Sequence, residues 1–145
     1  MADSVHHYET TAEWTAERRG TLTAPNRPSI NFGAPSEFGG TDDVWSPEHL
    51  CVAAVNTCTL LTFLAVAGNS KVPIKGCTSS ATGTLEKVEA RGPVITRVVV
   101  KLTVTVGPDV ARDKLARLFK LAEKHCFVSN SLQAAVSLEP EVVVA

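Results

Sequence analysis

The side chains best suited to covalent chemistry in this sequence are its four cysteines, Cys51, Cys58, Cys77 and Cys126. A cysteine thiolate is a strong nucleophile, and it can be oxidised reversibly to a sulfenic acid and then to a disulfide. Cys51 and Cys58 lie about 10.5 Å apart along a helix axis, so they cannot form a disulfide with each other. A Cys58–Cys126 disulfide requires Cα atoms within about 7 Å, which the sequence neither predicts nor excludes. Cys77 is the first residue of a predicted strand, and its side chain is expected to have a packing role only.

Cys58 lies in the middle of a predicted long helix. Ser46 is a candidate N-cap, Pro47 suits the first helical position, and Glu48 places a negative charge in the first turn. The pair Gly68-Asn69 is typical of a helix C-terminus. The local sequence therefore predicts that this helix positions Cys58.

The same helix carries no charged residue between Leu50 and Gly68, and its apolar residues surround the whole helix axis. Such a helix is expected to be buried on every side. At about 33 Å it is long for one small chain to cover, so we expect a homodimer partner to cover its other face. The length also permits a membrane span. However, Asn56 and the neighbouring threonines, together with acidic flanks, favour a protein that does not cross a membrane.

The sequence around the two central cysteines leaves two interpretations open. A free cysteine often packs as a small apolar residue, and burial in an apolar helix raises the pKa of a thiol. A reactive Cys58 therefore requires a cation beside it to stabilise the thiolate. Cys126 lies at a predicted helix break, where it is either passive or a resolving thiol for Cys58.

The remaining composition excludes several classes of function. The four histidines show no metal-ligand spacing, and no phosphate-binding or dinucleotide motif is present, so we expect no metal and no cofactor. The net charge of -1 gives no indication of nucleic-acid binding. No secretory signal is visible, and the sparse cysteines favour a cytoplasmic protein with reduced thiols.

Hydrophobic periodicity predicts an α+β fold in a single domain, residues 1–145. Strands are expected over residues 5–14, 21–23, 29–32, 77–89, 94–106 and 137–144. Helices are expected over residues 46–69, from Asp109 to about 125, and from Ser129 to about 135. Strands that follow one another in hairpins indicate antiparallel sheets, with Pro140 at an edge. In the strand over residues 94–106 one face is apolar: Val98, Val100, Leu102, Val104 and Val106.

Four short motifs occur in order along the chain: Gly39-Gly40, Ser-Pro-Glu-His-Leu at 46–50, Ala-Val-Asn-Thr-Cys at 54–58, and Cys-Phe-Val-Ser-Asn-Ser-Leu at 126–132. Together they resemble the OsmC/Ohr family. The resemblance implies an intertwined homodimer in which antiparallel sheets pack around long buried central helices. It also implies a thiol peroxidase that reduces organic hydroperoxides in defence against oxidative stress.

The resemblance further implies roles for individual residues. Cys58 matches the peroxidatic cysteine, and Cys126 matches the resolving cysteine that forms a disulfide with it. A dithiol reductant, such as a lipoylated protein, then reduces that disulfide. An arginine of the first strand turn holds the thiolate and is itself held by a glutamate, which Glu48 matches. Arg18 is the first choice for that arginine, by its distance from Gly20, and Arg19 is the alternate.

The sequence also departs from the family pattern. Phe127 stands where a proline usually follows the second cysteine, and Ser36 and Glu37 stand where many members have an arginine before the Gly-Gly loop. Asn56 and Thr57 replace smaller apolar residues next to Cys58. These departures suggest a divergent OsmC-like branch, and they leave an alternative: a non-enzymatic stress protein or a binder of small apolar ligands.

Overall fold

The computed structural model describes residues 4–145, and the chain divides into two compact units at Leu50 and Cys51. Each unit is described separately below. The expectation of one domain over residues 1–145 stays a prediction.

The N-terminal unit contains a three-stranded antiparallel sheet of order β1-β2-β3. Its strands are β1 (Thr11–Ala16), β2 (Arg19–Thr23) and β3 (Ile30–Gly33), followed by the short helix η1 (Ser36–Phe38). The expected first strand over residues 5–14 begins only at Thr11. Residues 5–10 alternate in polarity but have no strand partner, and alternation alone does not form a strand without a ladder of hydrogen bonds.

The helix α1 (Pro47–Asn69) begins as the sequence predicted. The Ser46 hydroxyl accepts a hydrogen bond from the His49 backbone N–H at 3.1 Å, which confirms Ser46 as the N-cap. The helix ends at Asn69, as the predicted range 46–69 requires, but Gly68 and Asn69 are both still helical and do not form the C-cap. The chain leaves the helix through Lys71, whose φ is 56°, and Val72 N–H bonds back to the Ala67 carbonyl at 2.9 Å. This is a Schellman ending in which a lysine adopts the left-handed conformation.

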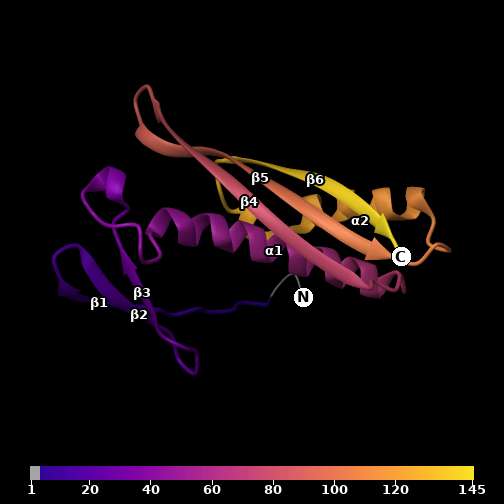
Figure 1. The fold of residues 1–145 in the computed structure, drawn as a ribbon, viewed down its shortest axis with the longest axis horizontal. Helices are drawn as coiled ribbons and strands as arrows, with labels where there is room; N and C mark the ends of the chain where they lie inside the picture. The colour runs from indigo at the N-terminus through magenta and orange to yellow at the C-terminus, as the bar shows by residue number, and fades with distance from the viewer. Residues whose placement is uncertain (1–3) are drawn as a thin grey trace. The chain divides into compact units, whose positions relative to one another are not determined.

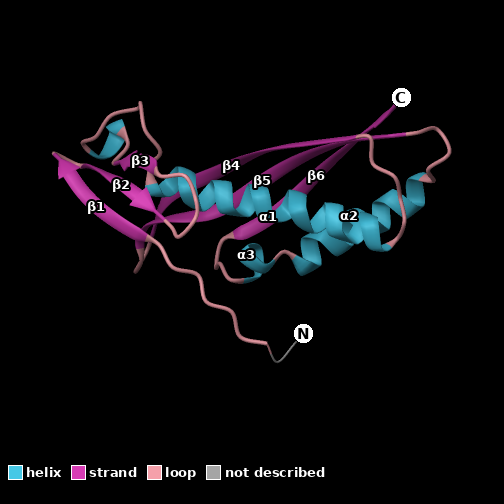
Figure 2. Cartoon of the chain, turned by 90° about the horizontal axis from the view of Figure 1, so that it is seen from below, coloured by secondary structure: helices cyan, strands magenta, loops and turns pink. Residues whose placement is uncertain are grey.

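The C-terminal unit contains a second sheet, and most of α1 together with the later helices belongs to this unit. Its strands are β4 (Gly76–Val88), β5 (Gly92–Val106) and β6 (Ala135–Val144), in the order β4-β5-β6. Its helices are α2 (Arg112–His125) and α3 (Phe127–Asn130). The long part of α1 and all of α2 lie along the same face of this sheet (Figures 1 and 2). The core between them consists of the predicted inward face of β5 together with residues of α1 and α2, among them Phe63, Ala67, Leu115 and Leu118.

Strand β6 runs parallel to β5, with Leu102 opposite Pro140. The sequence had indicated antiparallel sheets throughout, and for this pair that expectation is wrong. The reason is the connection: α2 and α3 form a crossover between the two strands, and a crossover returns the chain in the same direction. Pro140 does lie on an edge strand, as predicted, because β6 is at the end of the sheet order.

The two shorter helices also begin at other residues than expected. Helix α2 begins at Arg112 after Ala111, which has no capping side chain, and not at Asp109. Helix α3 begins directly after Cys126 and ends at Asn130, before the residue 135 that the sequence suggested. The earlier start of α3 places Cys126 at the junction of the two helices.

Helix α1 buries only one of its faces within the chain. The buried residues Val55, Thr59, Phe63 and Ala67 recur every fourth position. On the opposite side Leu61 is 63% exposed and Leu64 is 38% exposed. By length and composition α1 could also cross a membrane, and 22% of its apolar window is buried within this chain. The predicted burial on every side is therefore not met by a single copy.

Close packing between α1 and β4 depends on Gly83. A Cβ atom at this position would lie 2.5 Å from Cγ2 of Val52, which is closer than real contacts allow. The glycine thus allows α1 to approach the sheet two turns before Cys58.

Candidate active site

The two cysteines that the family resemblance singled out come close together in the C-terminal unit. Cys58 extends from the middle of α1, while Cys126 lies between α2 and α3, and both are free thiols. The Cys58 side chain lies close enough to Cys126 to lower the pKa of that thiol. Residues distant in the sequence are thus neighbours in the fold, which is a precondition for a disulfide between them.

Cys126 is buried, with 1% of its side chain exposed, and it has polar neighbours on two sides. The Ser129 hydroxyl donates a hydrogen bond to Sγ of Cys126 at 3.1 Å. The Thr59 hydroxyl lies 3.7 Å from the same sulfur. Burial raises the pKa of Cys126, but hydrogen bonds from the Ser129 hydroxyl and amide and from the Cys58 thiol outweigh it, so the pKa is lowered overall. The environment therefore favours a thiolate at Cys126.

Cys58 is half-buried, and its nearest polar side chain is Thr62, whose hydroxyl lies 3.9 Å from Sγ. That hydroxyl donates its proton to the Cys58 carbonyl at 2.7 Å. Within the C-terminal unit no cation is hydrogen-bonded to this sulfur. A reactive Cys58 thus still requires the cation that the sequence argument called for.

The sequence analysis did not predict that hydroxyl groups would contact the two sulfurs; these hydroxyls belong to Thr59, Thr62 and Ser129. A usable signal existed, since Thr62 follows Cys58 by one helical turn and Ser129 follows Cys126 at the spacing between an N-cap and the third helical residue. Neither spacing by itself distinguishes a thiol partner from an ordinary helix residue.

A small polar hollow of about 130 Å³ adjoins Cys126. Thr59 and Ser129, the two hydroxyl residues at the sulfur, are part of its wall, and Glu123 lines it as well. This volume can hold several water molecules, because one water needs roughly 10–15 Å³ of such space.

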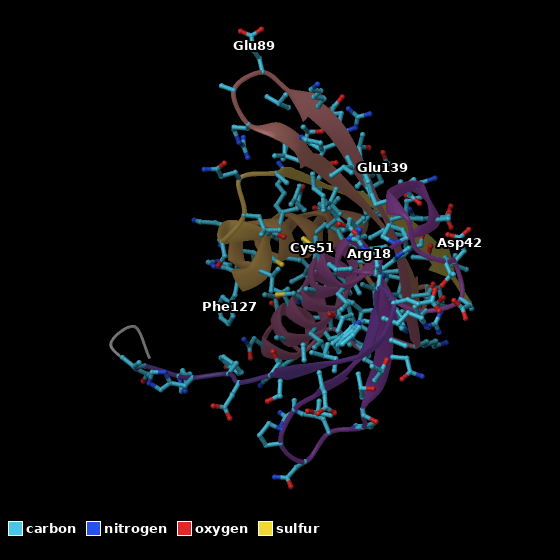
Figure 3. The ribbon with its side chains drawn as sticks, turned by 90° about the vertical axis from the view of Figure 1, so that its left-hand side faces the viewer. Arg18, Asp42, Cys51, Glu89, Phe127 and Glu139 are labelled. Atoms are coloured by element: carbon cyan, nitrogen blue, oxygen red, sulfur yellow. The ribbon has the colours of Figure 1, made fainter. Side chains whose placement is uncertain are left out.

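The other two cysteines have different surroundings. Cys77 pairs with Val104 across β4 and β5 and packs against the core, as expected from its strand position. Burial raises the pKa of Cys77, which disfavours a reactive thiolate. Cys51 is half-buried near the start of α1, and Figure 3 labels it on that helix.

The two candidate arginines, Arg18 and Arg19, differ in whether their guanidinium groups form an ion pair within the N-terminal unit. Arg19 forms an ion pair with Asp43 at 2.8 Å and donates a second hydrogen bond to Thr41 at 2.8 Å. The bond from Arg19 is the main reason that the pKa of Asp43 falls to about 2. Arg18 is exposed and has no ion pair among residues 4–145. Arg18 therefore has the uncommitted guanidinium.

Arg18 lies beside the Gly-Gly loop. Its Nη1 is 4.0 Å from the position that a Cβ atom would take at Gly39, whose φ of 86° also favours glycine. Glu48 carries a buried Oε1 without a hydrogen-bond partner in the described part of the chain, and Arg18 and Glu48 do not form an ion pair there. An interaction in which Glu48 holds the Arg18 guanidinium therefore stays a prediction.

Phe127, which replaces the usual proline after the second cysteine, is 81% exposed. Its ring projects away from the protein surface at the start of α3 (Figure 3). Within residues 4–145 no group of three or more histidine, cysteine or acidic side chains is arranged to hold a metal ion.

The fold and the paired thiols define the class of protein: an α+β protein in which a helix cysteine and a cysteine between two later helices are neighbours. The chain belongs to the OsmC family, since the profile of that family, described as OsmC-like protein, matches residues 40–141, more than half of the chain. Solved structures with a similar fold include proteins named for organic hydroperoxide resistance, from Legionella pneumophila and Bacillus subtilis.

Individual relatives agree with this assignment. The Bacillus subtilis protein YmaD, described as uncharacterized, is 26% identical over 99% of this chain and 97% of its own length. An OsmC-like protein of unknown function from Vibrio cholerae has a similar structure, with a TM-score of 0.86 at 22% identity, covering 94% of this chain and 99% of the other. An organic hydroperoxide resistance protein OsmC from Legionella pneumophila gives a TM-score of 0.77 at 18% identity, covering 98% of this chain and 100% of its own.

Proposed function

We propose that this protein is a thiol peroxidase that reduces organic hydroperoxides, with Cys58 as the peroxidatic and Cys126 as the resolving cysteine. The observation that carries the proposal is the proximity of these two free thiols, one on α1 and one at the junction of α2 and α3. Membership of a family that includes hydroperoxide resistance proteins supports the same chemistry.

The proposed reaction has two oxidative steps. The Cys58 thiolate attacks the terminal oxygen of the hydroperoxide, an S–O bond forms, the O–O bond breaks, and the alcohol leaves after taking up a proton. The Cys126 thiolate then attacks the sulfur of the Cys58 sulfenic acid, an S–S bond forms, and hydroxide leaves to become water on protonation. A dithiol reductant, of which a lipoylated protein is one example, restores both thiols by disulfide exchange.

An organic hydroperoxide fits this site better than hydrogen peroxide. Val55 lies on α1 one turn before the Thr59–Cys126 contact, and its surroundings include Val128 and Leu132. The exposed ring of Phe127 follows Cys126 directly. Apolar side chains on both sides of a thiol pair favour a substrate with an apolar body.

We also propose that the protein works as a homodimer in the reducing cytoplasm. The free state of all four thiols fits such a compartment. A second copy would cover exposed residues in the second half of α1, among them Thr57, Leu61, Leu64, Ala65 and Gly68. An exposed apolar face of this kind is typical of a surface that another protein covers.

The decisive experiment is a single oxidation of the fully reduced protein. One equivalent of cumene hydroperoxide should yield one equivalent of cumyl alcohol and a Cys58–Cys126 disulfide, identified by peptide mass spectrometry without reduction. The rate should exceed that of a free cysteine by at least about two orders of magnitude. Oxidation no faster than that of a free thiol would leave the non-enzymatic ligand-binding function as the better account.

Because the Arg18 guanidinium forms no ion pair within the described residues, we predict that substitutions of Arg18 and Arg19 have different effects on the oxidation of Cys58. Arg18→Ala should slow the oxidation of Cys58 about 100-fold at neutral pH, because a positioned charged donor stabilises the thiolate. Arg19→Ala is the matched control: it breaks the ion pair with Asp43 but should change the rate by less than about threefold. Stopped-flow oxidation by cumene hydroperoxide measures both. The reverse order of effects would assign the role to Arg19.

A further inference from the structure

Helix α2 exposes a row of cationic side chains on the side away from the core. Its sequence contains five lysine or arginine residues and two acidic ones, although the chain as a whole has a net charge of -1. All five cations are exposed, and none forms an ion pair among residues 4–145. Four of them recur at every third or fourth position and form what we call the basic face of α2: Lys114, Arg117, Lys120 and Lys124.

The acidic residues of α2 leave the end of this face near Cys126 positive. Asp113 lies in the first turn, where a carboxylate stabilises the helix N-terminus, and helix geometry places it about 20 Å from Cys126 along the axis. Glu123 accepts a hydrogen bond from the Leu138 backbone N–H through Oε2 at 3.1 Å. Lys124, by contrast, lies in the last turn of the helix, directly before the junction that holds Cys126.

Two exposed apolar side chains accompany the basic face. Leu121 is 39% exposed between Arg117 and Lys124, and Phe127 is 81% exposed at the start of α3. A helix face that only contacts solvent is normally polar throughout. Exposed leucine and phenylalanine among cations, arginine included, are more typical of a surface that another protein contacts.

From the position of this surface beside the thiols, we propose that the basic face of α2 is the docking surface for the reductant, a protein whose dithiol lies within an acidic surface. The inference rests on the proposed peroxidase function. Each turnover leaves a disulfide between Cys58 and Cys126, and the end of α2 lies next to that bond. Opposite charges on the two proteins would speed their encounter and orient the dithiol toward the disulfide.

The charge and packing of α2 argue against other occupants. A second copy of the chain would bring two basic faces together, and like charges repel. An anionic bilayer would attract the cations, but the apolar side of α2 packs in the core and is not free to enter a membrane. The net charge of -1 opposes a long-range attraction of the whole chain to nucleic acid. A protein with a local acidic surface fits these observations best.

The reductive step balances with two electrons from the dithiol. A thiolate of the reductant attacks Sγ of Cys58, which is half-buried, whereas Cys126 is fully buried. A mixed disulfide forms as the Cys58–Cys126 bond breaks, and Cys126 leaves as a thiolate. The second thiolate of the reductant then attacks its own sulfur in the mixed disulfide and releases Cys58. The reductant departs as a disulfide, and the two protons lost from its thiols are equal in number to those that Cys58 and Cys126 take up.

The test measures this reductive step alone, on the full-length protein oxidised beforehand with one equivalent of cumene hydroperoxide. The probes are synthetic peptides with the same Cys-x-x-Cys dithiol, flanked by glutamates, by glutamines or by lysines, and dithiothreitol is the small neutral reference. Acid quenching and mass spectrometry follow the loss of the disulfide. At an ionic strength of about 0.02 M the glutamate peptide should react about tenfold faster than the glutamine peptide, and the lysine peptide should be slowest. High salt should remove most of the difference.

Charge reversal at the end of α2 locates the effect. Lys120→Glu combined with Lys124→Glu should abolish the preference for the glutamate peptide and leave the rate with dithiothreitol within about twofold. Lys120→Gln combined with Lys124→Gln should reduce the preference, and it keeps the test available if the reversal destabilises the helix. The matched control is Arg97→Glu with Lys101→Glu. It makes the same change of charge on the outward face of β5, whereas α1 and α2 lie along the other face (Figures 1 and 2), and it should keep the preference.

The possible outcomes separate this inference from the proposed function. Equal rates for the glutamate and glutamine peptides with the unmodified protein would overturn the docking surface and leave the peroxidase intact. Loss of the preference in both charge-reversed proteins would assign it to net charge and not to α2. Binding of phosphatidylserine vesicles or duplex DNA that depends on Lys120 and Lys124, with peptide rates that do not, would also overturn it. If cumene hydroperoxide produces no Cys58–Cys126 disulfide, the proposed function fails before any reductant is added, and the docking surface fails with it.

Discussion

Replacement of Cys58 by serine should reduce the turnover of organic hydroperoxides to background, a loss of at least about three orders of magnitude. A serine hydroxyl is not ionised at neutral pH and is a poor nucleophile toward an O–O bond, whereas a thiolate reacts readily. A coupled assay with a dithiol reductant and cumene hydroperoxide measures the effect. The substitution changes one atom in a half-buried position, so the fold should persist.

Cys51→Ser supplies the matched control for this result. Cys51 lies on the same helix, two turns before Cys58, and is also half-buried. Its substitution should leave turnover within about twofold of the unmodified protein, since helix geometry places its sulfur about 10.5 Å from the reacting thiol along the axis. Loss of activity in Cys51→Ser with activity kept in Cys58→Ser would reassign the nucleophile.

The second large effect concerns the exposed face of α1. Leu61→Glu should convert a dimer into a monomer at micromolar concentration, with the dissociation constant raised by at least about 1,000-fold. Leu61 is 63% exposed in one chain and would lie inside the proposed interface, where an unpaired carboxylate is costly to bury. Sedimentation velocity measures the oligomeric state directly.

Val143→Glu is a useful comparison for this substitution. Val143 is 41% exposed, but it lies on the edge strand β6 and not on α1. It should leave the dimer intact. An unmodified protein that is monomeric in aqueous buffer would contradict the proposed interface, and one that requires detergent would favour the membrane-spanning interpretation of α1. A dimer in plain buffer argues against that interpretation.

The sequence predicted the fold best where local chemistry decides the structure. The N-cap at Ser46 and the inward face of β5 could be predicted because they depend on neighbouring residues and on the period of the apolar positions. The parallel direction of β6 could not be predicted, since it depends on how the crossover through α2 and α3 returns the chain to the sheet. The left-handed residue that follows the helix, Lys71, was missed because a lysine carries no glycine signal for that conformation.

For the candidate site, the family resemblance chose Cys58 and Cys126 from four cysteines, and the structure then brought these two together in the C-terminal unit. The choice of Arg18 over Arg19 stays a prediction. The structure adds one observation that favours it, namely that Arg19 is engaged by Asp43.

By itself, the sequence determined the elements, the apolar faces and the residues able to do thiol chemistry, because residue type and spacing along the chain carry that information. Only the tertiary structure decided which hydroxyls meet which sulfur. The Thr59 hydroxyl of α1 lies 3.7 Å from the sulfur of Cys126, and that contact depends on the approach of two segments that are far apart in the chain. The long helix that holds Cys58 is buried on one face by its own chain, while Leu61 and Leu64 on its other side are exposed.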